Sequence, residues 1–193
     1  HNGLNADLVI NPAKENFGIK FCRVDLSENN LINANFKNVV EPILCTKISN
    51  KDGVTVSTVE HLMAALYGEG IDNALIEINS SEIQILDGSA IEFLESIRSV
   101  CVKEQSTLRQ FIKVEKKIEI REGEKFISIE PSNNDLIIDF EIVYGNPLIR
   151  TRRKEFKLSQ DKLTEIYNSR TFCLYEDIDL IKSKGLAKGG SLD

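Results

Sequence analysis

The strongest constraint on the fold is a change of hydrophobic period in the first half of the chain. Short β-favouring runs at 7–10 and 17–24 are separated by an Asn-Pro turn, and a further strand is expected at 54–56. From residue 58 onward the apolar residues recur instead at helical spacing: Val59, Leu62, Met63 and Leu66. A buried strand at 74–78 and a second helix follow, the helix with the apolar stripe Ile91, Leu94, Ile97 and Cys101. This half therefore predicts strands followed by helices, which is typical of α+β folds.

The second half of the chain repeats this order. Alternating apolar and charged residues at 112–120 lead into a hairpin turn and further strands. Two helices are then expected, at about 159–168 and about 175–184. A polar segment at 103–107 separates the halves. We therefore predict two similar α+β domains, at 1–105 and 106–193, each with a small, mostly antiparallel sheet and two helices.

The composition excludes several classes of protein. Of 193 residues, 41% are hydrophobic and 28% charged, as in ordinary soluble globular proteins. The net charge of −6 argues against nucleic acid as a partner, and no apolar run approaches the roughly 18 residues that cross a bilayer. Four widely spaced cysteines are typical of reduced cytosolic thiols rather than of a disulfide framework.

The pair Glu60-His61 is the first candidate for chemistry, because it lies in the first turn of an expected helix. On spacing alone, two interpretations stay open: the pair could take part in catalysis with a metal, or it could be a helix cap beside a structural histidine. Glu60 follows Ser57 by three residues, which is the form of a capping box, and a lone histidine is usually structural. A catalytic zinc needs three protein ligands, and the chain has only two histidines in total.

Three other segments could carry function. Asp87, within Asp-Gly-Ser, could bind a substrate hydroxyl or could cap the following helix. The segment 170–172 joins two expected helices, and the Gly-Gly-Ser turn at 189–191 could present backbone N–H groups to an anion or be a flexible connection. None of these signals is decisive by itself.

Taken together, these segments resemble one enzyme family. The matching stretches, in the order and spacing of the family, are STVEHLMAAL (57–66), GIDN (70–73), ILDGSA (85–90), SRTF (169–172) and GLAKGGSLD (185–193). The first three residues match an early HTG stretch with one change. The resemblance covers the whole chain and is to UDP-3-O-acyl-N-acetylglucosamine deacetylase, a zinc-dependent enzyme of lipid A synthesis.

The resemblance implies a fold and a reaction. The fold would have two α+β domains, their helices packed between outward-facing sheets. The reaction would be hydrolysis of the acetamido group of UDP-3-O-(3-hydroxyacyl)-N-acetylglucosamine, which releases acetate and is the committed step of lipid A synthesis. By this resemblance Glu60 matches the general base, His61 the first zinc ligand, and Thr171 a hydroxyl that helps to hold the oxyanion.

Further matched positions would bind substrate. Leu44 and Cys45 match positions near the zinc, Tyr144 an aromatic residue that stacks on the uracil, and Asp87 an aspartate of open role. An apolar passage for the acyl chain would be lined by matched positions at Phe172, Ile178, Ala187, Ser191 and Leu192.

The resemblance also implies that the chain is a fragment. The first strand of the family would precede residue 1. The second histidine and the aspartate that bind zinc, within H-K-x-x-D, would follow residue 193, and so would the histidine that acts as general acid. We expect the 193 residues to bind zinc weakly at best and to be inactive.

We expect the parent protein to be a monomeric enzyme of a Gram-negative bacterium, located in the cytoplasm near the inner membrane. Two alternatives remain: the N-terminal part of a bifunctional deacetylase and 3-hydroxyacyl-ACP dehydratase, or a non-catalytic α+β binding module.

Overall fold

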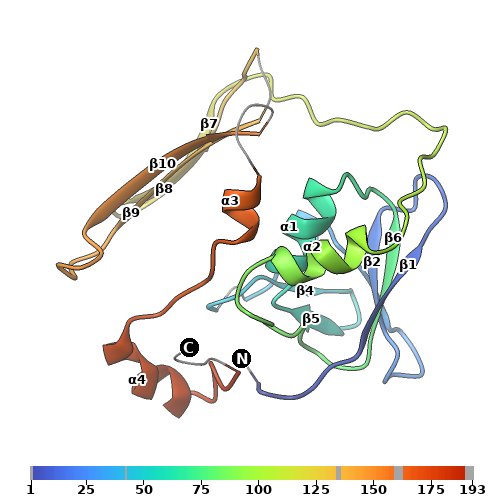
Figure 1. The fold of residues 1–193 in the computed structure, drawn as a ribbon, viewed down its shortest axis with the longest axis horizontal. Helices are drawn as coiled ribbons and strands as arrows, with labels where there is room; N and C mark the ends of the chain where they lie inside the picture. The colour runs from blue at the N-terminus through green and yellow to red at the C-terminus, as the bar shows by residue number, and fades with distance from the viewer. Residues whose placement is uncertain (1, 42, 134–135, 159–162, 190–193) are drawn as a thin grey trace. The chain divides into compact units, whose positions relative to one another are not determined.

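The largest sheet of the molecule has four strands. In the computed structural model, which describes residues 2–41, 43–133, 136–158 and 163–189, their order is β1-β6-β2-β3 (Figure 1). The strands are β1 (Leu8–Pro12), β2 (Ile19–Arg23), β3 (Leu31–Asn33) and β6 (Ala74–Ile78). β6 pairs antiparallel with β1 and parallel with β2, and β2 pairs antiparallel with β3. Small, mostly antiparallel sheets and few helices confirm the predicted α+β class.

A two-stranded ribbon leads from this sheet towards the first helix. It consists of β4 (Lys47–Ser49) and β5 (Thr55–Ser57), and it follows a short 3-10 helix, η1 (Phe36–Asn38). Asn50 shapes the turn, since its side-chain oxygen accepts from the N–H groups of Asp52 and Val54, both at 3.0 Å. Gly53 completes the turn with φ +81°, a conformation that glycine adopts without steric cost. Two residues, Thr58 and Val59, separate β5 from α1.

The main core lies between the four-stranded sheet and the helices α1 (Glu60–Gly68) and α2 (Ile91–Arg98), which contact each other. β6 buries alternate residues, because successive side chains of a strand point to opposite faces. The largest fully buried apolar side chains are Phe21, Ile32, Val56, Leu62, Leu66, Ile76, Ile78, Ile83 and Leu94. Burying a side chain of this size stabilises the fold by about 1.5–3 kcal/mol.

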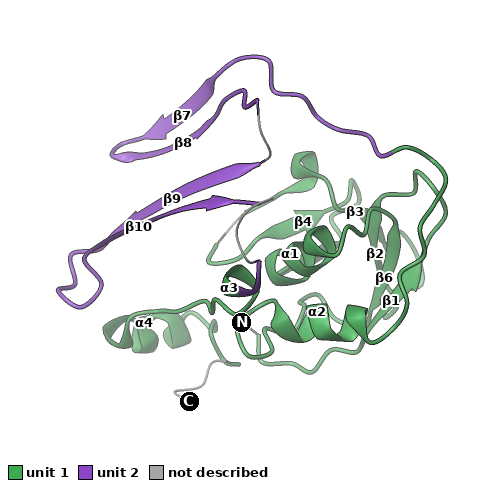
Figure 2. Cartoon of the chain, turned by 45° about the horizontal axis from the view of Figure 1, so that its top comes forward, with its two compact units in different colours: residues 1–108, 165–193 green, residues 109–164 purple. Residues whose placement is uncertain are grey.

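The chain divides into two compact units, coloured separately in Figure 2. Residues 1–108 and 165–193 form unit 1, and residues 109–164 form unit 2. Unit 2 contains two antiparallel hairpins, made from β7 (Ile118–Glu122), β8 (Lys125–Ile129), β9 (Ile137–Val143) and β10 (Thr151–Lys157). The prediction of two repeated domains with a boundary near residue 105 rests on the sequence pattern and stays a prediction.

The C-terminal segment of unit 1 carries short helices: α3 (Thr164–Tyr167), the 3-10 helix η2 (Tyr175–Asp177) and α4 (Ile178–Ser183). Tyr167 anchors this segment, because its side chain is 4% exposed and its ring lies against Gly68 at the end of α1. Among the residues that the structure describes, no helix is both long and apolar enough to span a bilayer.

Candidate active site

The carboxylate of Glu60 contacts the loop before β4. Glu60 is the first residue of α1, and its Oε2 accepts a hydrogen bond of 3.0 Å from the N–H of Thr46. Ser57 donates its N–H and its hydroxyl to the carbonyl of Ser81, at 3.0 and 3.2 Å. The helix N-cap is Val59. The predicted capping box between Ser57 and Glu60 is therefore wrong, and the interpretation of Glu60 as a helix cap loses its basis.

His61 lies beside Glu60 and is half-buried. Within residues 2–41, 43–133, 136–158 and 163–189, its imidazole has no hydrogen-bond partner. No buried side-chain nitrogen or oxygen of the described residues lacks a partner, so the unpaired ring nitrogens of His61 are accessible to solvent.

One histidine does not make a zinc site. Among the described residues, no group of three or more His, Cys, Asp or Glu side chains could hold a metal ion. A catalytic zinc requires three protein ligands. The described part of the chain therefore offers one candidate ligand, His61, and not a complete zinc site.

Asp87 is held by the turn that it begins. Its Oδ1 accepts from the N–H and the hydroxyl of Ser89, at 2.9 and 2.7 Å, and its Oδ2 lies 3.5 Å from Nε of Arg170. The hydroxyl and amide of Ser89, and after them the charge of Arg170, hold the pKa of Asp87 below its ordinary value. The carboxylate is therefore ionised at neutral pH, and the Ser89 hydroxyl in turn accepts from the N–H of Ile91 at 3.1 Å. Asp87 thus both organises the start of α2 and presents a negative charge.

The segment around Thr171 lies against the segment around Asp87. The N–H of Thr171 donates to the carbonyl of Gly88 at 2.8 Å, and the N–H of Ala90 donates to the carbonyl of Tyr167 at 3.0 Å. These bonds join residues about 80 positions apart in the sequence. Asp87 and Thr171, which sequence analysis treated as separate candidates, therefore belong to one site region.

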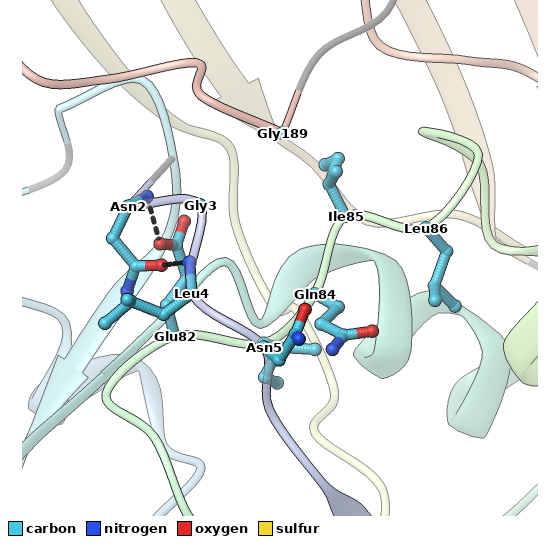
Figure 3. Close-up of a pocket in the computed structure, with 10 residues that line it drawn as sticks. Asn2, Gly3, Leu4, Asn5, Glu82, Gln84, Ile85, Leu86 and Gly189 are labelled. Atoms are coloured by element: carbon cyan, nitrogen blue, oxygen red, sulfur yellow. Dashed lines mark hydrogen bonds between the residues drawn. The ribbon is translucent and has the colours of Figure 1, made fainter.

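The first and last described residues also meet the 82–86 segment. A methyl group on Gly3 would lie 2.8 Å from Cβ of Lys188, and one on Gly189 would lie 3.7 Å from Cγ2 of Ile85. A small open pocket of about 250 Å³ lies here, lined by residues 2–5, 82–86 and Gly189 (Figure 3). Four of the five matching stretches are therefore connected within unit 1. The stretches 169–172 and 185–189 each contact 85–90, and the stretch 57–66 bonds to residues 81 and 83, which lead into 85–90.

Comparison with known proteins identifies the family. A family model described as UDP-3-O-acyl N-acetylglycosamine deacetylase (LpxC) matches residues 1–193. This chain belongs to that family. Among similar proteins, the UDP-3-O-acyl-N-acetylglucosamine deacetylases of Haemophilus ducreyi, Histophilus somni and Nitratiruptor sp. are 37%, 40% and 38% identical over 196, 196 and 194 residues. The alignments cover 100% of this chain and 64% of each relative, so the chain spans about two-thirds of their length.

Among the described residues, four of the eight non-glycine residues with positive φ lie at positions that match the family. Leu44, Thr58, Leu86 and Ala187 all have positive φ, at 56°, 59°, 51° and 52°. Such conformations are uncommon for residues with a Cβ, and above all for a β-branched residue such as Thr58. Strained residues of this kind cluster at functional sites, where the surrounding structure maintains them.

The remaining predicted positions differ in how far the structure describes them. Leu44 and Phe172 are 60% and 54% exposed, and Cys45, Ile178 and Ala187 are half-buried. All five belong to unit 1, whereas Tyr144, 39% exposed, belongs to unit 2. Ser191 and Leu192 lie outside the described residues.

Sequence analysis missed two residues that hold the site together. Thr46 supplies the backbone N–H that holds Glu60, and Glu82 accepts from the hydroxyl of Thr58 at 3.0 Å. Thr46 contacts Glu60 through its backbone N–H, which almost every residue type has, so the sequence could not indicate this contact. Glu82 carried only a weak signal, since it directly precedes the alternating apolar residues Ile83 and Ile85.

Proposed function

We propose that the full-length protein hydrolyses the N-acetyl group of UDP-3-O-(3-hydroxyacyl)-N-acetylglucosamine and releases acetate, the committed step of lipid A synthesis. The observation that carries the proposal is the geometry of Glu60: its carboxylate contacts the loop at Thr46, next to Leu44 and Cys45, instead of capping its own helix. Membership of the family and the names of the relatives support the choice of substrate.

Glu60 is the general base in this proposal. Its Oε2 accepts from Thr46, and Oε1 has no hydrogen-bond partner among the described residues, so one oxygen can accept a proton from the attacking water. The hydroxyl of Thr171 would donate to the oxyanion that forms as the amide carbonyl is attacked. Asp87, ionised and bound to Ser89, fixes the turn that contacts Thr171.

His61 would be the first ligand of a zinc ion. A zinc ion in such a site lowers the pKa of bound water and polarises the carbonyl. The described residues supply no second and third ligand. We propose that these ligands lie outside the 193 residues, and that the 193-residue chain binds zinc weakly and lacks activity.

The substrate would be held at both of its ends. In this proposal Tyr144 stacks on the uracil, and Leu44 and Cys45 lie near the metal. The acyl chain would lie along an apolar passage lined by Phe172, Ile178, Ala187, Ser191 and Leu192. We propose that the enzyme acts as a monomer in the cytoplasm of a Gram-negative bacterium, near the inner membrane.

The test is an assay of acetate release on two proteins, the full-length protein and the 193-residue chain. We expect the full-length protein to hydrolyse the substrate, to contain zinc and to lose activity when a chelator removes the metal. The 193-residue chain should be inactive at the same concentration. A full-length protein that releases no acetate would refute the proposed reaction, and full activity of the 193-residue chain would refute the assignment of zinc ligands outside it.

A further inference from the structure

Thr58, two residues before Glu60, has an unusual backbone conformation. It combines a β-branched side chain with φ +59° and is 1% exposed. A conformation of this kind costs free energy and persists only where neighbouring groups maintain it. The groups that maintain Thr58 therefore also maintain the direction in which the chain enters α1.

Glu82 is the side chain that contacts Thr58. Its Oε1 accepts from the Thr58 hydroxyl at 3.0 Å, and both residues are buried. The residues on either side of Glu82 also bond to the segment that contains Thr58. The N–H of Ser57 donates to the carbonyl of Ser81 at 3.0 Å, and the N–H of Ile83 donates to the carbonyl of Ser57 at 3.1 Å. Residues 57–58 and 81–83 are therefore joined by two backbone bonds and one buried side-chain bond.

The second oxygen of Glu82 reaches a different segment. Oε2 accepts from the N–H of Asn2 at 2.7 Å, a bond drawn in Figure 3. Hydrogen bonds to an ionised carboxylate are shorter and stronger than bonds between neutral groups, and low exposure strengthens them further. One buried carboxylate thus links the segment before α1 to the first residues of the chain.

We propose that Glu82 is a positioning residue for the reaction: by holding Thr58 in its left-handed conformation, it sets the direction in which the side chains of Glu60 and His61 leave α1. This inference rests on the proposed function for its kinetic consequence. Glu82 touches neither Glu60 nor His61 in any contact that the structure describes, so its effect passes through the backbone of Thr58.

The kinetic test uses the full-length protein with the variants Glu82→Gln, Thr58→Val and Thr58→Ser. Both Glu82→Gln and Thr58→Val should lower kcat roughly 10- to 100-fold with little change of KM, the scale expected when catalytic groups are misplaced by about 1 Å. Thr58→Ser keeps the hydroxyl and should restore most of kcat. Glu77→Gln is the matched control, because Glu77 also accepts a side-chain hydrogen bond, from Asn11 at 3.0 Å, but on β6 and away from Thr58.

A second readout does not depend on activity. In the full-length protein, the NMR signals of the His61 ring, assigned by their loss in His61→Ala, should shift in Glu82→Gln and Thr58→Val and stay in place in Thr58→Ser and Glu77→Gln. Unchanged His61 signals and unchanged kcat in both test variants would overturn the positioning role, even if those variants unfold at lower temperature. Absence of acetate release by the wild-type protein would instead refute the proposed function, and the NMR comparison would still decide the role of Glu82.

Discussion

At the scale of single residues, Glu60 and His61 are adjacent in sequence but differ in what holds them. Glu60 accepts from Thr46, whereas His61 has no hydrogen-bond partner within the described residues. A side chain that contributes no bond to the fold and is only half-buried contributes little to stability. In the proposed function, His61 serves instead as a metal ligand.

This difference gives a prediction that compares neighbours. His61→Ala should change the free energy of unfolding by less than about 0.5 kcal/mol in metal-free protein. Leu62→Ala, at a side chain that is 0% exposed, should cost about 2–5 kcal/mol, because it leaves a cavity in the core. Denaturant unfolding of both variants checks the contrast. A loss at His61 as large as that at Leu62 would mean that His61 is a structural residue.

The sequence could not decide between the two interpretations of Glu60. Ser57 and Glu60 have the spacing of a capping box, and that spacing is equally present when the pair does not form. The left-handed conformation of Thr58 precludes it here: the helix begins after Val59, and Ser57 turns to Ser81. A single unusual backbone angle is not encoded in a pattern of residue types, and the role of Glu60 as a general base was suggested only by the resemblance to a family.

At the scale of secondary structure, α1 and α3 are packed closely at one point. Gly68, the last residue of α1, lies against the ring of Tyr167, and a methyl group at Gly68 would overlap the Tyr167 hydroxyl. Tyr167 in turn accepts, through its carbonyl, from the N–H of Ala90. The close approach therefore connects α1 with the segment that carries Asp87 and Thr171.

Replacing this glycine should reverse the usual effect of alanine. In a helix interior, alanine is more favourable than glycine by about 1 kcal/mol. Gly68→Ala should instead destabilise the protein by about 1–3 kcal/mol, because the ring of Tyr167 has to move. Gly145→Ala is the control, since a methyl group there meets no atom within 4 Å among those described. Thermal unfolding of both variants checks this, and a more stable Gly68→Ala would contradict the contact.

The end of the polar segment after α2 is hydrogen-bonded to the carboxylate of Glu15, between β1 and β2. Glu15 accepts from the hydroxyl of Thr107 and from the N–H and hydroxyl of Ser106, the last two at 2.8 Å. These donors, the Thr107 hydroxyl first, lower the pKa of Glu15 to about 2 from 4.5. The segment 103–107, predicted to be a boundary, is thus held at Ser106 and Thr107 by Glu15.

The lowered pKa of Glu15 predicts a pH dependence with a defined sign. A carboxylate whose pKa is lower in the folded state stabilises the fold fully above its unfolded pKa, and this stabilisation is lost as the pH falls through the folded value. Glu15→Gln should therefore destabilise the protein at neutral pH, and the difference from wild type should shrink between about pH 4.5 and pH 2. Glu28→Gln, which removes an exposed carboxylate, is the control for the loss of one negative charge. A pH-independent effect of Glu15→Gln would contradict the assignment.

Prediction of the elements succeeded where apolar runs were long enough to show a period. The expected strand at 74–78 matches β6, and the helix expected after residue 58 is α1. The three-residue strands β3 and β4 were missed, because three residues do not establish an alternation. Residues 112–115 alternate in the same way as β7 but lie outside it, since alternation alone supplies no partner strand.

At the scale of the whole molecule, the two units differ in how their apolar residues are used. In unit 1, β6 buries Ala74, Ile76 and Ile78, and α1 buries Leu62, Ala65 and Leu66. In unit 2, all five residues of β7 and of β8 are exposed, and the cross-strand pairs Ile118–Ile129 and Ile120–Ile127 lie on one open face. Two-stranded hairpins are marginally stable by themselves.

Hydrogen exchange should therefore separate the units in the 193-residue chain. Amides of β7–β10 should exchange through openings of much lower free energy than amides of β2 and β6, which lie in the core sheet. Exchange measured by mass spectrometry over both groups of peptides checks this. Equal protection of the two groups would contradict the difference in burial.

The link between distant segments could not be derived from the sequence pattern. Residues 85–90 and 167–171 meet through the bonds from Thr171 to Gly88 and from Ala90 to Tyr167. Local periodicity predicts elements and carries no information on which loops meet. The resemblance to a family grouped these motifs under one function but did not say which of them are in contact.

The most direct test of the account is the rate of acetate release by the full-length protein and its Glu60→Gln variant. The amide oxygen of glutamine still accepts from Thr46, so the fold should be preserved and the thermal unfolding temperature unchanged. Loss of a general base should lower kcat by about 10²–10⁴-fold. A folded Glu60→Gln variant that releases acetate at the wild-type rate would contradict the assignment of Glu60 as the base.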